Sequence, residues 1–223
     1  MNATGLLARA RALLLDFDGP VCSVFAGIPA STVADQLREV LADSGHTDLP
    51  DAVATSADPF DVLQYASTVG GNEARYVEVA FTAHEVEAIS SATPTNGAHE
   101  LIEAWRESGR PLAIVSNNSA PAINAYLDLY DLRMSINFVS ARISSNVALL
   151  KPSPYLLNQA VAELDVPPRE SVLIGDSTSD IEAAKAARVR SIGYANKPGK
   201  QSSLSMAGTD AIIDTLTGLT TVA

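Results

Sequence analysis

The sequence predicts an α/β protein with a doubly wound parallel sheet and a small all-helical domain inserted after the first strand. Two observations lead to this prediction. Short apolar runs alternate with helical patterns over most of the chain. One long stretch near the N-terminus breaks this alternation and carries helical patterns only. With 223 residues, of which 47% are hydrophobic and 18% charged, the chain can build a proper core.

Six short apolar runs are expected to form the sheet. Near-continuous apolar runs are typical of parallel strands that helices cover on both faces. The expected strands are Ala12–Leu15, Leu112–Val115, Ile136–Val139, Val172–Ile174, Arg190–Tyr194 and Ala211–Ile213. Each is followed within two residues by Asp, Asn, Ser or Gly, which favour turns.

Helical patterns fill the intervals between these runs. "NGAHELIEAWRESG" places Leu101, Ile102 and Trp105 at helical spacing and stops at Gly109. "PSPYLLNQAVAEL" begins with proline near its first turn and then carries an apolar stripe, and "STSDIEAAKAA" predicts a short alanine-rich helix. Strands and helices of these lengths indicate a doubly wound sheet.

Residues 21–93 contain no convincing strand and predict the helical insert. Three segments carry helical patterns: "PASTVADQLREVLADSG", "DPFDVLQYASTVG" and "NEARYVEVAFTAHEVEAI". The second opens with Asp58 as a candidate N-cap, Pro59 at the first helical position and Asp61 three residues after the cap. We therefore predict an α/β core from residues 1–20 and 94–223, and a helical cap domain from residues 21–93.

The negative net charge of the chain argues against two classes of binding partner. A formal net charge of −11 argues against a nucleic-acid surface and against an anionic membrane. No apolar run approaches 18 residues, and the N-terminal segment, interrupted by Arg9 and Arg11, does not resemble a signal peptide. The single cysteine, Cys22, excludes an internal disulfide. We expect a cytoplasmic protein that gathers its cations locally if it handles an anionic substrate.

The candidate catalytic and metal-binding residues lie near the carboxyl ends of the predicted strands. Ligands of doubly wound sheets bind beyond the carboxyl ends of the strands. The residues that follow the strands there, or that open the next helix, are Asp16, Asp18, Ser116, Asn117, Lys151, Asp176 and Asp180. Carboxylates around one point need a hard divalent cation, and oxygen ligands select Mg²⁺. Such a cation attracts phosphate, for which Lys151 adds a positive charge and Ser116 a hydroxyl. A carboxylate nucleophile is a route to an aspartyl-phosphate.

At this point the sequence resembles the haloacid dehalogenase superfamily. "DFDGPV", "VSNNS", "KPSPY" and "IGDSTSD" look like the family's four sequential motifs, each in order after its strand. The helical insert resembles the helical cap of phosphoglycolate phosphatase-like members. The resemblance extends from about Arg11 to Asp214 and implies a Rossmann-like core.

The resemblance also implies roles for individual residues. Asp16 would be the nucleophile and a Mg²⁺ ligand, and Asp18 the general acid/base whose main-chain carbonyl also binds the metal. Ser116, with the backbone of Asn117, would bind the transferring phosphoryl group. The remaining implied roles are that Lys151 pairs with Asp16 and the phosphate, that Asp176 is a metal ligand and that Asp180 supports the metal site and the lysine.

The sequence departs from the family pattern at one position. Pro20 stands where the family usually has threonine after D-x-D-G. Proline lacks a backbone N–H and fixes φ, so it could alter the turn and any hydrogen bond to Asp18.

We therefore predict a Mg²⁺-dependent phosphatase that acts on a small phosphorylated metabolite. The presence of Asp18 argues against a true dehalogenase, because a leaving halide needs no proton. Two alternatives stay open: a sugar-phosphate mutase of the same fold, and a non-catalytic phosphate-binding or signalling module. The sequence gives neither the substrate nor the oligomeric state.

Overall fold

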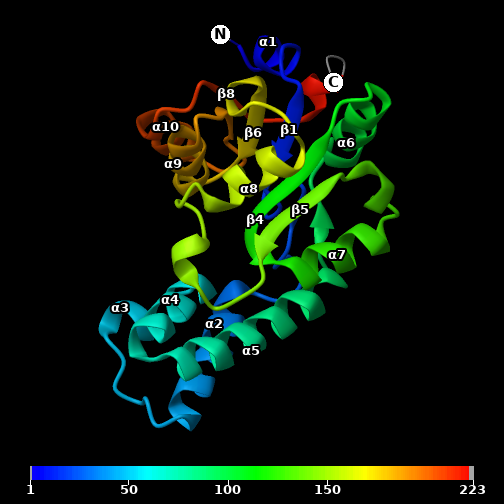
Figure 1. Cartoon of the computed structure of the whole chain (residues 1–223). Coiled ribbons are helices and arrows are strands. Elements are labelled where there is room, and N and C mark those ends of the chain that lie inside the picture. Colours follow the sequence, from blue (N-terminus) through cyan, green and yellow to red (C-terminus); the bar gives the residue numbers. More distant parts are fainter. Residues whose placement is uncertain (1, 221–223) are drawn as a thin grey trace.

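A computed structural model describes residues 2–220 and contains a six-stranded sheet in which all neighbouring strands are parallel. The strand order is β5-β4-β1-β6-β7-β8 (Figure 1). The strands are β1 Ala12–Leu15, β4 Leu112–Ser119, β5 Phe138–Arg142, β6 Ser171–Gly175, β7 Arg190–Tyr194 and β8 Ala211–Ile213. The predicted doubly wound α/β fold is therefore confirmed, and β1 lies at its centre between β4 and β6.

Helices cover both faces of the sheet because its strands are apolar on both sides. Leu13 and Leu15 of β1 belong to one buried cluster, whereas Leu14 between them belongs to the other. The first face is covered by α1, α6 and α7, and the second by α8 and α9, with α10 beside α9. The bounds of these helices are α1 Ala3–Leu7, α6 Ala98–Glu107, α7 Ala120–Leu129, α8 Tyr155–Glu163, α9 Thr178–Ala187 and α10 Lys200–Ala207.

The segment after β1 forms the expected helical unit. Its helices are α2 Ala30–Asp43, α3 Asp51–Ala54, α4 Pro59–Val69 and α5 Gly71–Ile89, and they pack around a separate apolar cluster. Asp58 caps α4 as predicted, because its side chain accepts a hydrogen bond from the N–H of Phe60. The long helix α5 reaches back to α7 of the core, where Ala88 and Ile89 join the main cluster (Figure 1). The domain division at residues 21 and 93 stays a proposal.

Two expectations about strands were wrong in detail. The third of the expected strands, β5, runs from Phe138 to Arg142 rather than from Ile136 to Val139. Its second half is polar, and Ser140 and Arg142 are buried because hydrogen-bond partners satisfy them. Residues 21–93 also contain strand residues: β2 (Cys22–Ser23) pairs with β3 (Thr93–Pro94) in an antiparallel ribbon. Two-residue strands are too short to leave a sequence pattern.

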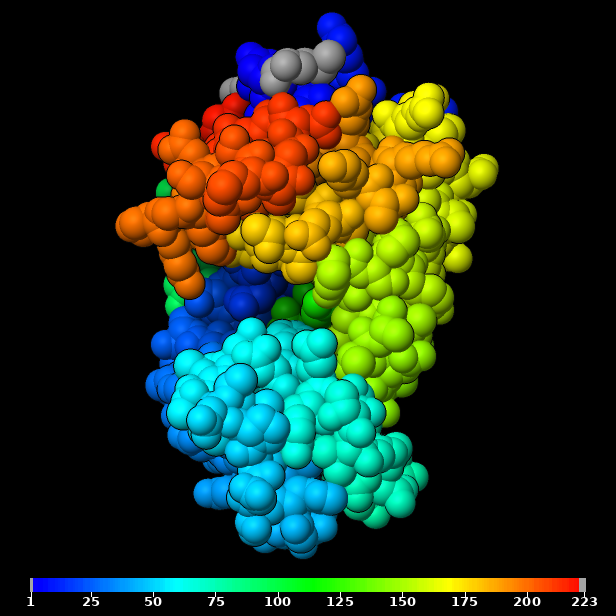
Figure 2. Space-filling model, turned by 90° about the vertical axis from the view of Figure 1, so that its left-hand side faces the viewer, coloured from blue at the N-terminus to red at the C-terminus, as the bar shows by residue number. Residues whose placement is uncertain are grey.

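This ribbon joins the helical unit to the core beside the carboxyl ends of the strands. Figure 2 shows that the surface is hollowed between the cyan helical segment and the orange and yellow-green parts of the core. Blue and green atoms from earlier parts of the core form the floor of this hollow. Within residues 2–220, no helix combines the length and the apolar character that crossing a bilayer requires.

Candidate active site

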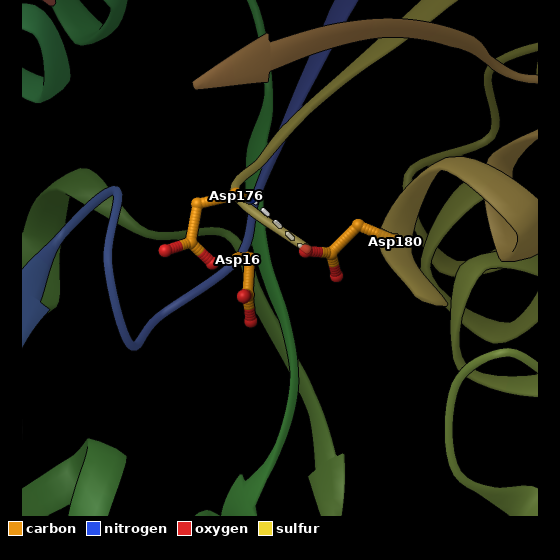
Figure 3. Close-up of side chains that lie close together, drawn as sticks. All are labelled: Asp16, Asp176 and Asp180. Atoms are coloured by element: carbon orange, nitrogen blue, oxygen red, sulfur yellow. Dashed lines mark hydrogen bonds between the residues drawn. The ribbon is translucent and has the colours of Figure 1, made fainter. Parts of the chain in front are cut away.

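The sheet brings together side chains from three neighbouring strands. Leu15 of β1 is paired with Ile114 of β4 and with Ile174 of β6, so the residues after these positions meet at one edge. Asp16 therefore lies level with Val115 of β4, one residue before Ser116 in the same strand, and beside the end of β6, which leads to Asp176. Figure 3 shows Asp16, Asp176 and Asp180 side by side, from the ends of β1 and β6 and from the first turn of α9.

Lys151 lies buried at the centre of this group. Its Nζ donates to Oδ1 of Asp16 at 2.8 Å, to Oδ1 of Asp180 at 2.5 Å and to the carbonyl of Val115 at 3.0 Å. The side chain of Asn117 holds the lysine segment in place, since it accepts from the main-chain N–H of Lys151 at 2.8 Å and donates to its carbonyl at 3.1 Å. The sequence predicted the lysine's partners, but it assigned Asn117 only a backbone role.

Asp180 is fixed in a supporting position by the start of α9. Ser177 is the N-cap of this helix and Asp180 completes a capping box with it. Oδ2 of Asp180 accepts from the hydroxyl of Ser177 at 2.7 Å and from the main-chain N–H groups of Asp176 and Ser177. Both oxygens of Asp180 are thus occupied by protein donors.

The donor set fits a hard divalent cation. Within residues 2–220, one group of three carboxylates has ligand atoms within 4.8 Å of one another: Asp16, Asp176 and Asp180. Among the described hydrogen bonds, none uses Oδ2 of Asp16 or Oδ1 of Asp176, so each residue keeps one oxygen for a cation. Close by, the buried Oδ1 of Asn196 is without a partner among the described residues, while its amide nitrogen donates to Asp176.

The electrostatics also favour an added positive charge. Burial and then the carboxylate of Asp180 raise the pKa of Asp16 to about 7, although Lys151 opposes this shift. Burial would lower the pKa of Lys151, but Asp16 and Asp180 more than offset it and raise that pKa. Burial would raise the pKa of Asp180, yet Lys151 and Ser177 lower it. One lysine therefore satisfies Asp180 but leaves Asp16 short of positive charge, which a cation between Asp16 and Asp176 would supply.

Asp18 occupies a different environment from the three clustered aspartates. It lies in the turn that leads to β2, where its Oδ1 accepts from the N–H of Val24 at 2.9 Å. Burial is the main cause that raises the pKa of Asp18, and the charge of Asp176 adds to it. A carboxyl with a raised pKa and one oxygen engaged can carry a proton on the other oxygen.

Pro20 fits this turn without distorting it. Gly19 has φ +112°, which favours glycine, and an added Cβ there would overlap the carboxylate of Asp176. The turn is closed by the N–H groups of Val21 and Cys22, which both donate to the carbonyl of Phe17. The turn therefore does not need an N–H group at Pro20. The hydrogen bond from the N–H of Val24 to Asp18 forms with proline at this position.

We expect the substitution Asp18→Asn to stabilise the metal-free protein at neutral pH. Because the folded-state pKa of Asp18 is raised, its ionised form costs folding free energy above that pKa, and the cost disappears below the unfolded-state pKa of about 3.9. Asparagine keeps an acceptor for Val24. In EDTA at about pH 8 we expect Tm to rise by about 2–4 °C, equivalent to ~1 kcal/mol, and the gain to vanish near pH 3.5. A gain that is the same at both pH values would contradict this reading.

A buried network behind Ser116 was not predicted from the sequence. The hydroxyl of Ser116 donates to Oδ1 of Asn118 at 3.1 Å, and Nδ2 of Asn118 donates to Glu85 of α5 at 2.9 Å. Glu85 also accepts from Nη2 of Arg142 at 2.5 Å, and Nε of Arg142 donates to the carbonyl of Asn117 at 3.1 Å. The network ties the loop after β4 to the helical unit. Its one sequence signal is that Glu85 continues the apolar stripe of Val77 and Phe81.

Lys200 was also missed by sequence reasoning. It opens α10 and forms an ion pair with Oδ2 of Asp176, to which Asn196 donates at 3.0 Å. Both residues follow β7, whose carboxyl end lies next to that of β6. The signal that could have found them is their place after a strand of the sheet, in the stretch "YANKPGK".

Comparisons with known proteins agree with this geometry. The family model of haloacid dehalogenase-like hydrolases matches residues 10–188. A protein named "Phosphoglycolate phosphatase, plasmid" from Cupriavidus necator is 28% identical over 93% of this chain and 90% of its own length.

Solved structures share the fold. A variant of CbbY from Rhodobacter sphaeroides in complex with xylulose-(1,5)bisphosphate superposes with a TM-score of 0.67 at 23% identity, over 93% of this chain and 95% of that one. A hydrolase from Pseudomonas syringae gives a TM-score of 0.70 at 19% identity over the same shares of the two chains. The similarity to phosphoglycolate phosphatases supports a phosphatase enzyme. The chain belongs to the haloacid dehalogenase-like hydrolase family.

Proposed function

We propose that this protein is a Mg²⁺-dependent phosphatase that hydrolyses a small phosphomonoester through an aspartyl-phosphate on Asp16. The observation that carries this proposal is the placement of Asp16, which combines a bond to the buried Lys151 with an oxygen left open beside Asp176. Asp16 and Asp176 would hold the metal, with the main-chain carbonyl of Asp18 as the third protein ligand that the family pattern implies. When bound, Mg²⁺ supplies charge neutralisation for the phosphate and for the carboxylates.

In the first half of the reaction, a carboxylate oxygen of Asp16 attacks phosphorus and the bond to the ester oxygen breaks. Lys151 orients Asp16 and offsets negative charge on the phosphoryl group, and the hydroxyl of Ser116, rotated away from Asn118, donates to a phosphoryl oxygen. The protonated carboxyl of Asp18 gives its proton to the departing oxygen, which leaves as an alcohol.

In the second half, the carboxylate of Asp18 takes a proton from water, whose oxygen attacks the phosphorus of the aspartyl-phosphate. The bond to Asp16 breaks and inorganic phosphate leaves, so Asp16 and Asp18 return to their starting states. The hydrogen bond from Val24 fixes one oxygen of Asp18 and leaves the other for both proton transfers. The helical unit, closing over the hollow, would exclude bulk water during the first half.

We expect phosphate release from esters in a panel of phosphorylated metabolites and from p-nitrophenyl phosphate, dependent on added Mg²⁺. EDTA should abolish this release and Mg²⁺ should restore it. Release of free phosphate, rather than its return to a sugar, separates the phosphatase from a mutase of the same fold. If no ester in the panel loses phosphate with Mg²⁺ present, the proposal fails and a phosphate-binding module is favoured.

A further inference from the structure

A cavity lies between helix α4 and the segment before α8, next to the catalytic lysine. It has a volume of about 260 Å³ and is lined by Phe60, Leu63 and Gln64 of α4 and by six further residues: Asn117, Val147, Ala148, Leu150, Lys151 and Pro152. The cyan and yellow-green atoms of these two parts of the chain both border the hollow in Figure 2, together with orange atoms of the core. Lys151, which binds Asp16, and Asn117 both line this cavity, so the cavity adjoins the site on the side of α4.

The lining is apolar apart from the amide groups and the lysine. Phe60, Leu63 and Val147 belong to or pack against the apolar cluster of the helical unit, and Ala148, Leu150 and Pro152 add further apolar surface. Gln64 is exposed, and its side-chain amide makes no hydrogen bond among the described residues. This amide offers both a donor and an acceptor, which match hydroxyl groups better than a lone anion.

The helical insert brings no positive charge to this cavity. Residues 21–93 contain eleven acidic residues and two arginines, and neither arginine lines the cavity. Arg38 donates to the carbonyls of Val53 and Ser56 and pairs with Asp35 at 2.5 Å. Arg75 lies 5.5 Å from the ring centroid of Tyr76. A carboxylate or second phosphate placed against α4 would lose hydration without an ion pair.

The lysines of the core near this site either form ion pairs already or do not line the cavity beside α4. Lys151 is held between Asp16 and Asp180, and Lys200 is held by Asp176. Lys197 is exposed, its charge lowers the pKa of Asp18, and it lines a different cavity from the one beside α4. Lys151 is thus the one cation among the residues that line the cavity beside α4, and it is already paired with two carboxylates.

We infer that the substrate is a phosphate monoester of an uncharged, hydroxyl-bearing alcohol, whose carbon skeleton packs on Phe60 and Leu63 and whose free hydroxyl binds Gln64. This inference rests on the proposed phosphatase function. It separates this chain from relatives named for phosphoglycolate, which carries a carboxylate, and from the neighbour bound to xylulose-(1,5)bisphosphate, which carries a second phosphate.

Two esters that differ mainly in one charge test the inference: glycerol 3-phosphate and 3-phosphoglycerate. We expect kcat/KM to be at least about tenfold higher for glycerol 3-phosphate, whose alcohol part is uncharged, than for 3-phosphoglycerate. This ratio corresponds to about 1.4 kcal/mol. If both turn over too slowly, their inhibition constants against p-nitrophenyl phosphate should differ in the same direction. Equal values or a preference for 3-phosphoglycerate would overturn the inference while leaving the phosphatase intact. Absence of Mg²⁺-dependent activity on every ester would instead refute the proposed function, and this inference with it.

A charge placed at Gln64 provides a second test. Because Gln64 is exposed on α4, Gln64→Arg should leave the fold unchanged and should shift the ratio of the two kcat/KM values toward 3-phosphoglycerate by about tenfold or more. The matched control is Asn72→Arg, which adds the same charge to an exposed residue of α5 outside the cavity lining. We expect no change of ratio in the control. The same shift in both variants would contradict a binding role for Gln64.

Discussion

Replacing Asp16 with asparagine is expected to lower kcat/KM by about 10⁴-fold or more, the scale on which an enzyme loses its nucleophile. Asparagine has almost the same shape, and its carbonyl oxygen can still accept from Lys151 and from the N–H of Phe17. It has no carboxylate to attack phosphorus. Steady-state kinetics with p-nitrophenyl phosphate and saturating Mg²⁺ would measure the loss.

Thermal unfolding in EDTA separates this loss from misfolding. Burial raises the pKa of Asp16, so a neutral side chain removes a cost of folding at neutral pH. The Asp16→Asn protein should therefore melt no lower than the parent protein. Activity within tenfold of the parent would refute the role of Asp16, whatever the melting temperature.

The substitution Arg142→Met is expected to have the largest effect on stability. The guanidinium is fully buried, binds Glu78 at 2.6 Å and Glu85 at 2.5 Å, and lies 4.6 Å from the ring centroid of Phe81. Methionine fills much of the space but leaves Glu85 buried without its cation. Breaking one partner of a buried pair costs about 3–5 kcal/mol. We therefore expect Tm to fall by roughly 10 °C or more, since 1 kcal/mol corresponds to about 2–4 °C in a chain of this size.

Two further variants test whether the loss of stability comes from the buried charge of Glu85. Arg190→Met removes an exposed pair, because the side chains of Arg190 and Asp210 are 57% and 28% exposed. Such a pair contributes roughly 0–1 kcal/mol, so Tm should barely change. Adding Glu85→Gln to Arg142→Met removes the stranded charge and should recover part of the lost stability. A fall in Tm as small as that of Arg190→Met would show that the network does not hold the helical unit to the core.

The sheet and most of the candidate site were predictable because they depend on local patterns. Parallel strands covered on both faces are mostly apolar, so β1, β7 and β8 were predicted with their observed bounds. Asp16 and Asp176 follow such strands, and topology alone brings the ends of β1 and β6 together. Lys151 was found because a cation is rare in this chain and stands beside a proline-rich helix start.

The rest depends on contacts between residues far apart in the sequence. Glu85 and Arg142 are separated by 57 positions, and each alone indicates a solvated surface residue. Their mutual ion pair is what allows both to be buried, and it also explains why the polar end of β5 was not recognised as a strand. The hydrogen bonds that link Asn117 to Lys151, and Lys200 to Asp176, likewise exist only once the sheet has aligned their loops.

The negative charge of the helical unit could be read from the sequence, but the position of its two arginines relative to the cavity could not. The two arginines among residues 21–93 are visible in the sequence, yet only the fold shows that neither lines the cavity beside Lys151. Gln64 is exposed and yet lines the cavity, because α4 packs against the segment that contains Val147 and Ala148.

The central claim is that Asp16 carries the phosphoryl group, and mass spectrometry of acid-quenched protein tests it most directly. The protein is mixed with Mg²⁺ and excess substrate, quenched within milliseconds, digested in acid and compared with Asp16→Asn. The account predicts a gain of about 80 Da on the peptide containing Asp16, present in the parent and absent from the variant, because a carboxylate nucleophile forms a covalent phosphoryl intermediate. Rapid release of phosphate with no modified peptide at any quench time, or the same modification in Asp16→Asn, would contradict it.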